Sequence, residues 1–254
     1  MIKKSLEGSL KRLKTDYIDI YQFHNPSFCP KPGDGTGLYE AMLEAKAQGK
    51  IHFIGLTNHR LPVAIEACES GLYDTIQFPF SYLADQKDID LVHKCKENNI
   101  GFICMKALSG GLINRSDAAY AYLAQFDNVL PIWGIQKESE LDEFISYQTK
   151  APELTQEIQD LIAHDRKELA GDFCRGCGYC MPCPKGIQIN QCARMSLMLR
   201  RAPAASWLNE HWQNEMKKIE ECLNCGKCMT KCPYHLNTPE LLKKNYKDYK
   251  TFLK

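Results

Sequence analysis

Nine of the thirteen cysteines of this chain lie within residues 174–232, and eight of the nine form two closely spaced quartets. The earlier quartet has the spacing C-x2-C-x2-C-x2-C-P, and the later one has the spacing C-x2-C-x2-C-x3-C-P. Three thiolates at x2 intervals on a tight loop can bind three corners of an iron–sulfur cube, but the loop cannot supply the fourth. The spacing therefore predicts two [4Fe–4S] clusters, each completed by a cysteine from the other quartet.

The two expected ligand sets are as follows: Cys174, Cys177, Cys180 and Cys232 for one cluster, and Cys222, Cys225, Cys228 and Cys183 for the other. This crossed arrangement is that of a bacterial two-cluster ferredoxin. A pair of zinc sites is the rival interpretation, because C-x2-C pairs also bind zinc. Zinc has no use for a third cysteine at the same spacing or for a Cys-Pro in both quartets, so we favour iron–sulfur clusters.

The remaining cysteines need a different interpretation. Cys29, Cys68, Cys95 and Cys104 are scattered singly through the first half of the chain, as buried thiols in a reducing compartment usually are. Cys192 lies between the quartets without matching their spacing, and we expect it to be a packed thiol rather than a ligand.

Charge divides the chain at the same place as the cysteines. Residues 1–172 carry 18 basic and 25 acidic side chains, a formal charge of −7, whereas residues 173–254 carry 14 and 6, a formal +8. Two clusters with their thiolates would offset about half of that positive charge, so the basic segment does not by itself indicate nucleic-acid binding.

Hydrophobic residues make up 44% of the sequence, enough for a sizeable core. No apolar run reaches the roughly 18 to 20 residues that a membrane span requires. The first twenty residues have neither the apolar region nor the cleavage site of a signal peptide. We therefore expect a cytoplasmic protein that does not enter a membrane.

Short β-rich runs alternate with amphipathic segments through the first part of the chain, which predicts an α/β fold with a parallel sheet. The expected strands are 17–24, 51–58, 75–80, 101–107 and 129–135. The expected helices are 3–13, 37–49, 61–71, 87–98, 116–126 and 138–148. We expect three parts: a barrel-like domain over 1–150, a bridging helix over 151–172, and a cluster domain over 173–254 with helices between the quartets.

Polar residues follow the expected strands at their C-terminal ends, namely His24, Thr57, Asn58, Gln77 and Lys106. In a (β/α)8 barrel the active site lies at that rim. Only five strands are expected here, so the barrel would be incomplete.

Several of these segments resemble consecutive segments of aldo-keto reductases, and most closely the bacterial branch with a C-terminal ferredoxin-type extension. They are SLKRLKTDYIDIYQFHNP, GKIHFIGLTNH, YDTIQFPFSYL, GFICMKALSGGL and PIWGIQKESELDEF. The resemblance implies an incomplete (β/α)8 TIM barrel, with about five of eight strands, followed by an α-helical, ferredoxin-like domain with two [4Fe–4S] clusters. It also implies a nicotinamide cofactor, NAD(P)H.

The resemblance assigns roles residue by residue. His24 matches the histidine that orients the substrate carbonyl, and Thr57, Asn58 and Gln77 match residues that hold the nicotinamide carboxamide.

Two further stretches match the rest of the cofactor. Residues 105–111, which include Lys106 and Gly110, lie where the family binds the pyrophosphate. Residues 134–143, which begin with Gly134, lie where it binds the adenosine end.

The resemblance also implies what this chain lacks. The family's catalytic tyrosine, aspartate and lysine belong to segments before those matched here, so Met1 falls near the helix that precedes the fourth strand. Glu140 stands where NADPH-preferring members often have an arginine, and Phe144 where an asparagine is common. The proton donor for carbonyl reduction is then missing from the chain.

Three hypotheses follow. The leading one is an iron–sulfur oxidoreductase of the aldo-keto reductase type, which performs NAD(P)H-linked carbonyl reduction, electron transfer or both. Its missing strands are encoded upstream or supplied by another polypeptide. Its partners would be a small carbonyl substrate or an electron-transfer protein. The second is a ferredoxin-like electron carrier on a catalytically inactive barrel remnant. In the third, the clusters serve only the structure of a partner-binding protein.

Overall fold

The computed structural model describes residues 2–169, 173–201 and 203–253, which form two compact units whose segments alternate along the sequence. The sheet unit consists of 2–80, Ala84–Met105 and Ala124–Ile132. The cysteine unit consists of Ser81–Leu83, Lys106–Leu123 and the described residues from Trp133 to 253. The expected boundaries at residues 150 and 172 stay predictions, and residue 172 lies outside the described ranges.

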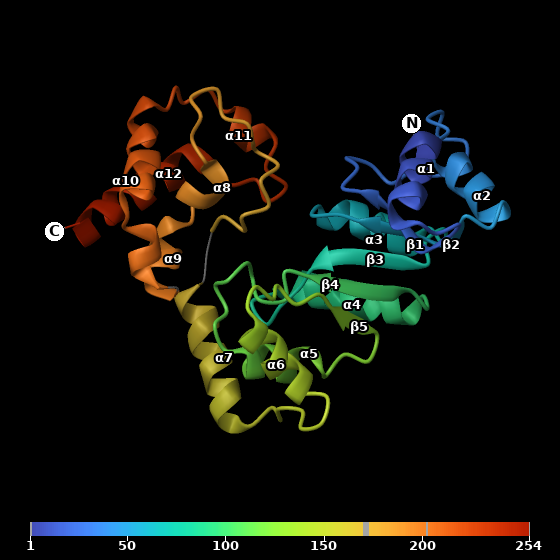
Figure 1. Ribbon diagram of the computed structural model, residues 1–254, viewed down its shortest axis with the longest axis horizontal. Helices are drawn as coiled ribbons and strands as arrows, with labels where there is room; N and C mark the ends of the chain where they lie inside the picture. The colour runs from blue at the N-terminus through green and yellow to red at the C-terminus, as the bar shows by residue number, and fades with distance from the viewer. Residues whose placement is uncertain (1, 170–172, 202, 254) are drawn as a thin grey trace. The chain divides into compact units, whose positions relative to one another are not determined.

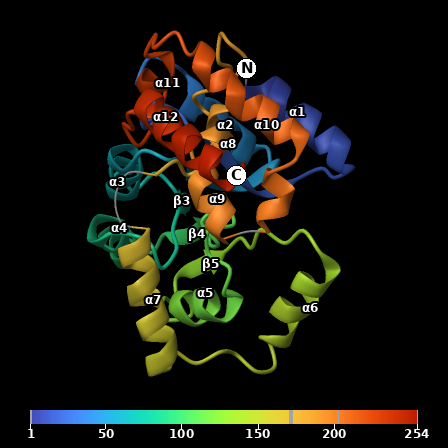
Figure 2. The ribbon, with the colours of Figure 1, turned by 90° about the vertical axis from the view of Figure 1, so that its left-hand side faces the viewer.

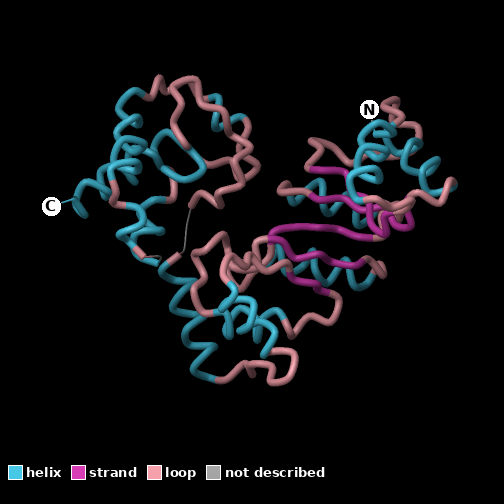
Figure 3. The backbone as a smooth tube through the Cα atoms, viewed as in Figure 1, coloured by secondary structure: helices cyan, strands magenta, loops and turns pink. Residues whose placement is uncertain are grey.

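The sheet unit is built on five parallel strands in the order β1-β2-β3-β4-β5 (Figures 1 and 3). The strands are β1 (Ile18–His24), β2 (Ile51–Thr57), β3 (Thr75–Pro79), β4 (Gly101–Met105) and β5 (Val129–Pro131). Their register places His24 opposite Thr57 and Thr57 opposite Gln77. The expected strands and the parallel α/β class are thereby confirmed.

Helices cover one face of this sheet. They are α1 (Ile2–Leu13), α2 (Leu38–Ala47), α3 (Leu61–Glu69) and α4 (Gln86–Glu97), of which α2, α3 and α4 contact β2, β3 and β4 respectively. Val63 and Ala67 lie one turn apart on the buried stripe of α3. Asp85 caps α4 by accepting a hydrogen bond from the Asp88 amide.

The other face of the sheet is only partly covered by the chain. Ile54 on β2 is buried toward the helices, whereas its neighbour Phe53 is 48% exposed. Ile20, Phe53 and Leu130 lie on the same side of the sheet by register, and we call them the open face. Within the described residues, β1 and β5 pair along one edge only.

The cysteine unit is mainly helical, and no helix in the described chain is long and apolar enough to cross a membrane. Its α-helices are α5 (Ser116–Leu123), α6 (Glu138–Ser146), α7 (Gln156–Glu168), α8 (Ile189–Cys192), α9 (Met195–Arg201), α10 (Glu210–Lys217), α11 (Lys227–Thr230) and α12 (Thr238–Tyr249). Its 3-10 helices are η1 (Ala204–Trp207), η2 (Lys218–Glu221) and η3 (Lys250–Leu253). Both ribbon views show α8 to α12 gathered in one group (Figures 1 and 2).

Apolar side chains from the helices between and after the quartets form a core beneath the cysteine loops. Met195, Leu199, Met216 and Leu242 are all nearly or fully buried in it. Tyr249 closes the core, and its hydroxyl donates to the Trp207 carbonyl at 2.8 Å. The quartets therefore stand on a packed helical base, not on an isolated loop.

A buried carboxylate joins α7 to α9 within the same unit. Asp165 Oδ1 accepts from Arg201 Nη2 at 2.5 Å, and its Oδ2 accepts from the Tyr82 hydroxyl at 2.5 Å. Arg201 Nη2 also contacts Glu168 Oε2 at 2.7 Å. The Arg201 guanidinium, only 7% exposed in its side chain, is thus compensated by two carboxylates.

Candidate functional site

Two neighbouring pockets of the cysteine unit are lined by the quartet cysteines. The first cysteine pocket is lined by three thiols of the earlier quartet and one of the later. Those four residues are Cys174, Cys177, Cys180 and Cys232. They are the four that the spacing predicts for one cluster, although they come from segments more than fifty residues apart.

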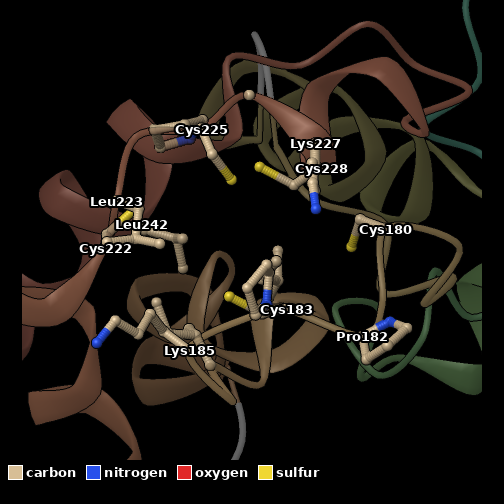
Figure 4. A pocket seen from close by; sticks show the side chains of 15 residues that line it. Cys180, Pro182, Cys183, Lys185, Cys222, Leu223, Cys225, Lys227, Cys228 and Leu242 are labelled. Carbon is tan, nitrogen blue, oxygen red and sulfur yellow. The ribbon is translucent and has the colours of Figure 1, made fainter.

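The second cysteine pocket is lined by the complementary set, namely Cys183, Cys222, Cys225 and Cys228. In Figure 4 the sulfur atoms of Cys225 and Cys228 point toward each other, and that of Cys183 faces the same space. Cys180 lines both pockets and lies between them. With Cys180 assigned to the first pocket, each pocket offers four sulfur donors, the donor set that a [4Fe–4S] cluster requires.

Local backbone conformation explains how the loops turn their thiols inward. Residues 173–188 form neither helix nor strand (Figure 3). Gly176 has φ +67°, which a residue with a side chain rarely adopts, and its amide donates to Cys174 Sγ at 3.5 Å. Gly226, at φ +72°, begins the short helix α11 that carries Cys228. Amides directed at sulfur stabilise thiolate charge and tune a bound cluster.

Burial acts on the protonation of these thiols. It raises the pKa of Cys174 and Cys177 above the ordinary value, and it raises the pKa of Cys180 to about 12. Neighbouring sulfur atoms add to the effect at Cys180. Because iron binds the thiolate form, cluster assembly would release these protons and replace them with metal charge.

The other cysteines behave as expected. Cys29, Cys68, Cys95 and Cys104 are all buried in the sheet unit, which confirms that they are packed thiols. Cys192 is fully buried in the core of α8 to α12. All thirteen cysteines are free thiols.

The structure brings four of the predicted cofactor and catalytic residues to one edge of the sheet. His24, Thr57 and Gln77 stand at or near the C-terminal ends of β1, β2 and β3, in register with one another. Asn58 follows directly, and its amide donates to the Gln77 carbonyl at 3.0 Å. Parallel strands end at the same edge, which is where α/β sheets bind ligands.

The side chain of Asn58 differs from the others because it is already engaged by the backbone. Its Nδ2 donates to the Pro26 carbonyl at 2.8 Å, and its Oδ1 accepts from the Arg60 amide at 2.8 Å. The residue is fully buried. Asn58 therefore braces the loop after β2.

Lys106 and Gly110 belong to the cysteine unit, in the loop that follows β4. Lys106, Ser109 and Gly110 all have positive φ, and the Ser109 amide donates to the Lys106 carbonyl at 2.7 Å. The carbonyl oxygen of Gly110 accepts a hydrogen bond from the guanidinium of Arg194. This loop is therefore fixed by an arginine that the sequence analysis did not single out.

Gly134 and Glu140 also lie in the cysteine unit. Gly134 is exposed, and a Cβ atom there would meet nothing within 4 Å. Glu140 Oε2 accepts from the backbone amides of Gln136 and Lys137 at 2.8 and 3.2 Å, and so caps α6. Glu140 thus has a structural role that the resemblance did not indicate.

Arg194 is the main polar residue that sequence reasoning missed. It is 5% exposed and lies in the apolar stretch between α8 and α9. A charged residue embedded in INQCARMSLML was the available signal, because isolated charges are rarely buried without a reason.

Comparison with known proteins connects these sites to a family. The aldo/keto reductase family matches residues 1–127, and a 4Fe–4S dicluster domain matches residues 173–237. A methylglyoxal reductase of Salmonella typhi is 41% identical over 93 residues, which are 34% of this chain and 33% of that protein. An NADH-specific methylglyoxal reductase of Escherichia coli is 32% identical over 112 residues, 44% of this chain and 34% of its own.

The same fold is found in solved structures. An aldo-keto reductase from Bacillus halodurans, in its apo form, aligns with a TM-score of 0.53 at 22% identity, over 65% of this chain and 67% of that one. This chain spans only about a third of the length of the curated relatives it matches. By the family match over residues 1–127, the chain belongs to the aldo/keto reductase family, and it carries a 4Fe–4S dicluster domain in addition.

Proposed function

We propose that this chain is the iron–sulfur part of a cytoplasmic oxidoreductase in which two [4Fe–4S] clusters pass single electrons to or from a nicotinamide-dependent carbonyl site. The observation that carries the proposal is the grouping of eight thiols around two cysteine pockets that share Cys180, with both quartets contributing to both pockets. Bound clusters would supply one-electron redox chemistry there.

The residues of each pocket would hold one cluster. The ligands of the first would be Cys174, Cys177, Cys180 and Cys232, and those of the second Cys183, Cys222, Cys225 and Cys228. The Gly176 amide is directed at Cys174 Sγ, and a packed apolar core lies beneath the cysteine loops. Both effects are means by which a protein sets a cluster's potential.

At the edge of the sheet, His24 would orient a substrate carbonyl, while Thr57 and Gln77 would hold the nicotinamide. The Gln77 side chain is already oriented, because its Oε1 accepts from Gln22 Nε2 at 3.0 Å. The loop with Lys106 and Gly110 would receive the pyrophosphate, and the stretch that begins at Gly134 the adenosine end.

Carbonyl reduction also needs a proton donor. We propose that a polypeptide bearing the remaining strands supplies it, because the open face leaves Phe53 and Leu130 exposed at 48% and 66%. An exposed apolar face beside unpaired strand edges is a surface that proteins ordinarily cover.

A ferredoxin-like electron carrier without hydride chemistry is the second candidate. The observation that favours it is the difference in completeness: each cysteine pocket has its full donor set, whereas Asn58 uses its amide to brace a loop. The partner-binding hypothesis, with purely structural clusters, differs from both in predicting no reduction by a biological donor.

An anaerobic assay of the cluster-loaded chain separates the candidates. Iron and sulfide are quantified first, and binding of NADH and NADPH is then measured together with their oxidation by simple aldehydes or by a viologen dye. We expect bound clusters and nicotinamide binding, with aldehyde turnover only when the remaining strands are supplied. Clusters without nicotinamide binding would favour the electron carrier, and absence of clusters would refute the proposal.

A further inference from the structure

Arg194 is a buried cation with few partners. Its guanidinium donates to the Gly110 carbonyl and lies 2.8 Å from Met198 Sδ. Its Nε atom is buried and has no hydrogen-bond partner in the described part of the chain. A carbonyl and a thioether orient the group, but neither carries a charge that offsets it.

Arg201, at the C-terminal end of α9, is another buried guanidinium of the same unit and has different partners. Arg201 pairs with Asp165 and Glu168, whereas Arg194 forms no ion pair with any carboxylate among the described residues. An unpaired charge is costly to bury, so an anion is expected beside it. Burial lowers the pKa of Arg194, and negative charge on Cys174 acts in the opposite direction.

The surroundings of Arg194 identify where that anion would be. A Cβ atom on Gly176 would lie 2.5 Å from Arg194 Nη1, and one on Gly110 would lie 2.8 Å from the same atom. Gly176 is in the loop between Cys174 and Cys177, two lining residues of the first cysteine pocket. The absence of side chains at both glycines lets the guanidinium approach this loop.

We propose that Arg194 is the counter-ion of the cluster in the first cysteine pocket. Its charge raises the reduction potential of that cluster relative to the same cluster without the arginine. The inference rests on the proposed function, since it requires the cluster. With four thiolates an oxidised [4Fe–4S] cluster carries a charge of about −2, and uptake of one electron makes it about −3. A fixed cation in a low-dielectric site favours the more negative state.

The test is a redox titration of the loaded chain with a viologen as one-electron donor, followed by EPR. Arg194→Gln removes the charge, and Arg194→Lys retains it. For Arg194→Gln we expect at least a tenfold fall in the ratio of reduced to oxidised first cluster at fixed solution potential, or about 59 mV for a one-electron couple. Arg194→Lys should stay closer to the parent.

Two comparisons control for net charge and assign the signals. Arg200→Gln removes an exposed arginine that pairs with Asp248, and it should leave both potentials within a small fraction of that change. Cys177→Ala and Cys225→Ala identify which EPR signal belongs to the first pocket and which to the second. An equal shift of both clusters in Arg194→Gln would contradict a local counter-ion.

A second substitution keeps Arg194 in place and neutralises it. Met198→Glu would put a carboxylate where the thioether already contacts the guanidinium, and it should lower the first cluster's potential as Arg194→Gln does. Met198→Gln is its uncharged control. The comparison of Met198→Glu with Met198→Gln tests the effect of the Arg194 charge even where Arg194→Gln does not retain clusters.

The outcomes distinguish a failure of the role of Arg194 from a failure of the proposed function. A parent chain that binds no iron refutes both. A parent with two reducible clusters, together with unchanged potentials in Arg194→Gln or Met198→Glu, refutes only the role of Arg194. Equal shifts in Arg194→Gln and Arg194→Lys would mean that packing, not charge, sets the potential, and this would also overturn it.

Discussion

The cysteine pockets and the strand-end residues of the sheet differ in how their polar groups are brought together. The eight thiols of the two pockets come from two short loops that rest on one helical core. The strand-end residues come from three parallel strands whose open face retains exposed apolar side chains. The cysteine pockets therefore have a complete set of sulfur donors, whereas the strand-end residues lie on a sheet with an exposed apolar face.

Removal of cysteines, singly and two at a time, should give the largest effect, a loss of bound iron. The combined losses test whether each cysteine pocket holds its own cluster. A chain with two clusters holds about eight iron atoms, and Cys225→Ala should reduce this to about four. Adding Cys183→Ala should leave about four, because both residues line the second pocket. Adding Cys183→Ala to Cys177→Ala should remove nearly all iron.

Iron content and EPR measure these variants, and Cys192→Ala serves as control because that thiol lies in the core and should leave the iron unchanged. The crossed grouping is wrong if Cys183→Ala causes a further loss of iron when combined with Cys225→Ala but none when combined with Cys177→Ala. Each quartet would then hold one cluster by itself.

Asp165→Asn tests the ionic support of the cysteine unit. The change leaves Arg201 with less compensation, and breaking a buried pair costs about 3–5 kcal/mol. Urea unfolding followed in the cysteine unit measures the loss. Asp160→Asn, an exposed change on the same helix, should cost less than about 0.5 kcal/mol; equal effects would exclude a special role for Asp165.

The loss of stability caused by Asp165→Asn should depend on pH. Burial acts to raise the pKa of Asp165, but hydrogen bonds from Arg201 and Tyr82 outweigh it and hold the pKa below its ordinary value. This stabilisation is complete above the unfolded-state pKa of about 3.9 and is lost as the pH falls through the lower folded-state pKa. The difference in unfolding free energy between the parent and Asp165→Asn should therefore shrink in acid.

Two substitutions at adjacent residues of β2 test the packing of the two faces of the sheet. The substitution on the open face should have the smallest effect on the free energy of unfolding. Ile54→Ala opens a cavity under the helices and should cost about 2–5 kcal/mol. Phe53→Ala, on the open face, should change the unfolding free energy by no more than about 0.5 kcal/mol. A large cost for Phe53→Ala, or one that grows with protein concentration, would show that the open face is already covered.

Much of the sheet could be predicted because its signals are local. Each expected strand is found, with ends that differ by at most four residues, and the meeting of His24, Thr57 and Gln77 follows from the parallel order. The helices expected within residues 1–150 are found as well, with ends that differ by up to three residues: the helix expected over 116–126 ends at Leu123. Helix ends depend on tertiary contacts that propensity does not contain.

Two polar residues have partners that no local pattern could identify. Asn58 is held by the Pro26 carbonyl, and Arg194 reaches the Gly110 carbonyl across more than eighty residues of sequence. In each case the side chain's role depends on which backbone group the fold brings within hydrogen-bond distance.

The sequence by itself determined the thiol chemistry, the parallel α/β class and the resemblance to a reductase family, because spacing and periodicity are properties of short segments. The sequence also predicted which thiols belong together. Only the tertiary structure showed two pockets lined by those sets, and only it decided which buried arginine lacks a carboxylate. Both depend on contacts between residues far apart in the chain, and the packed helical core, not the local sequence, brings those residues together.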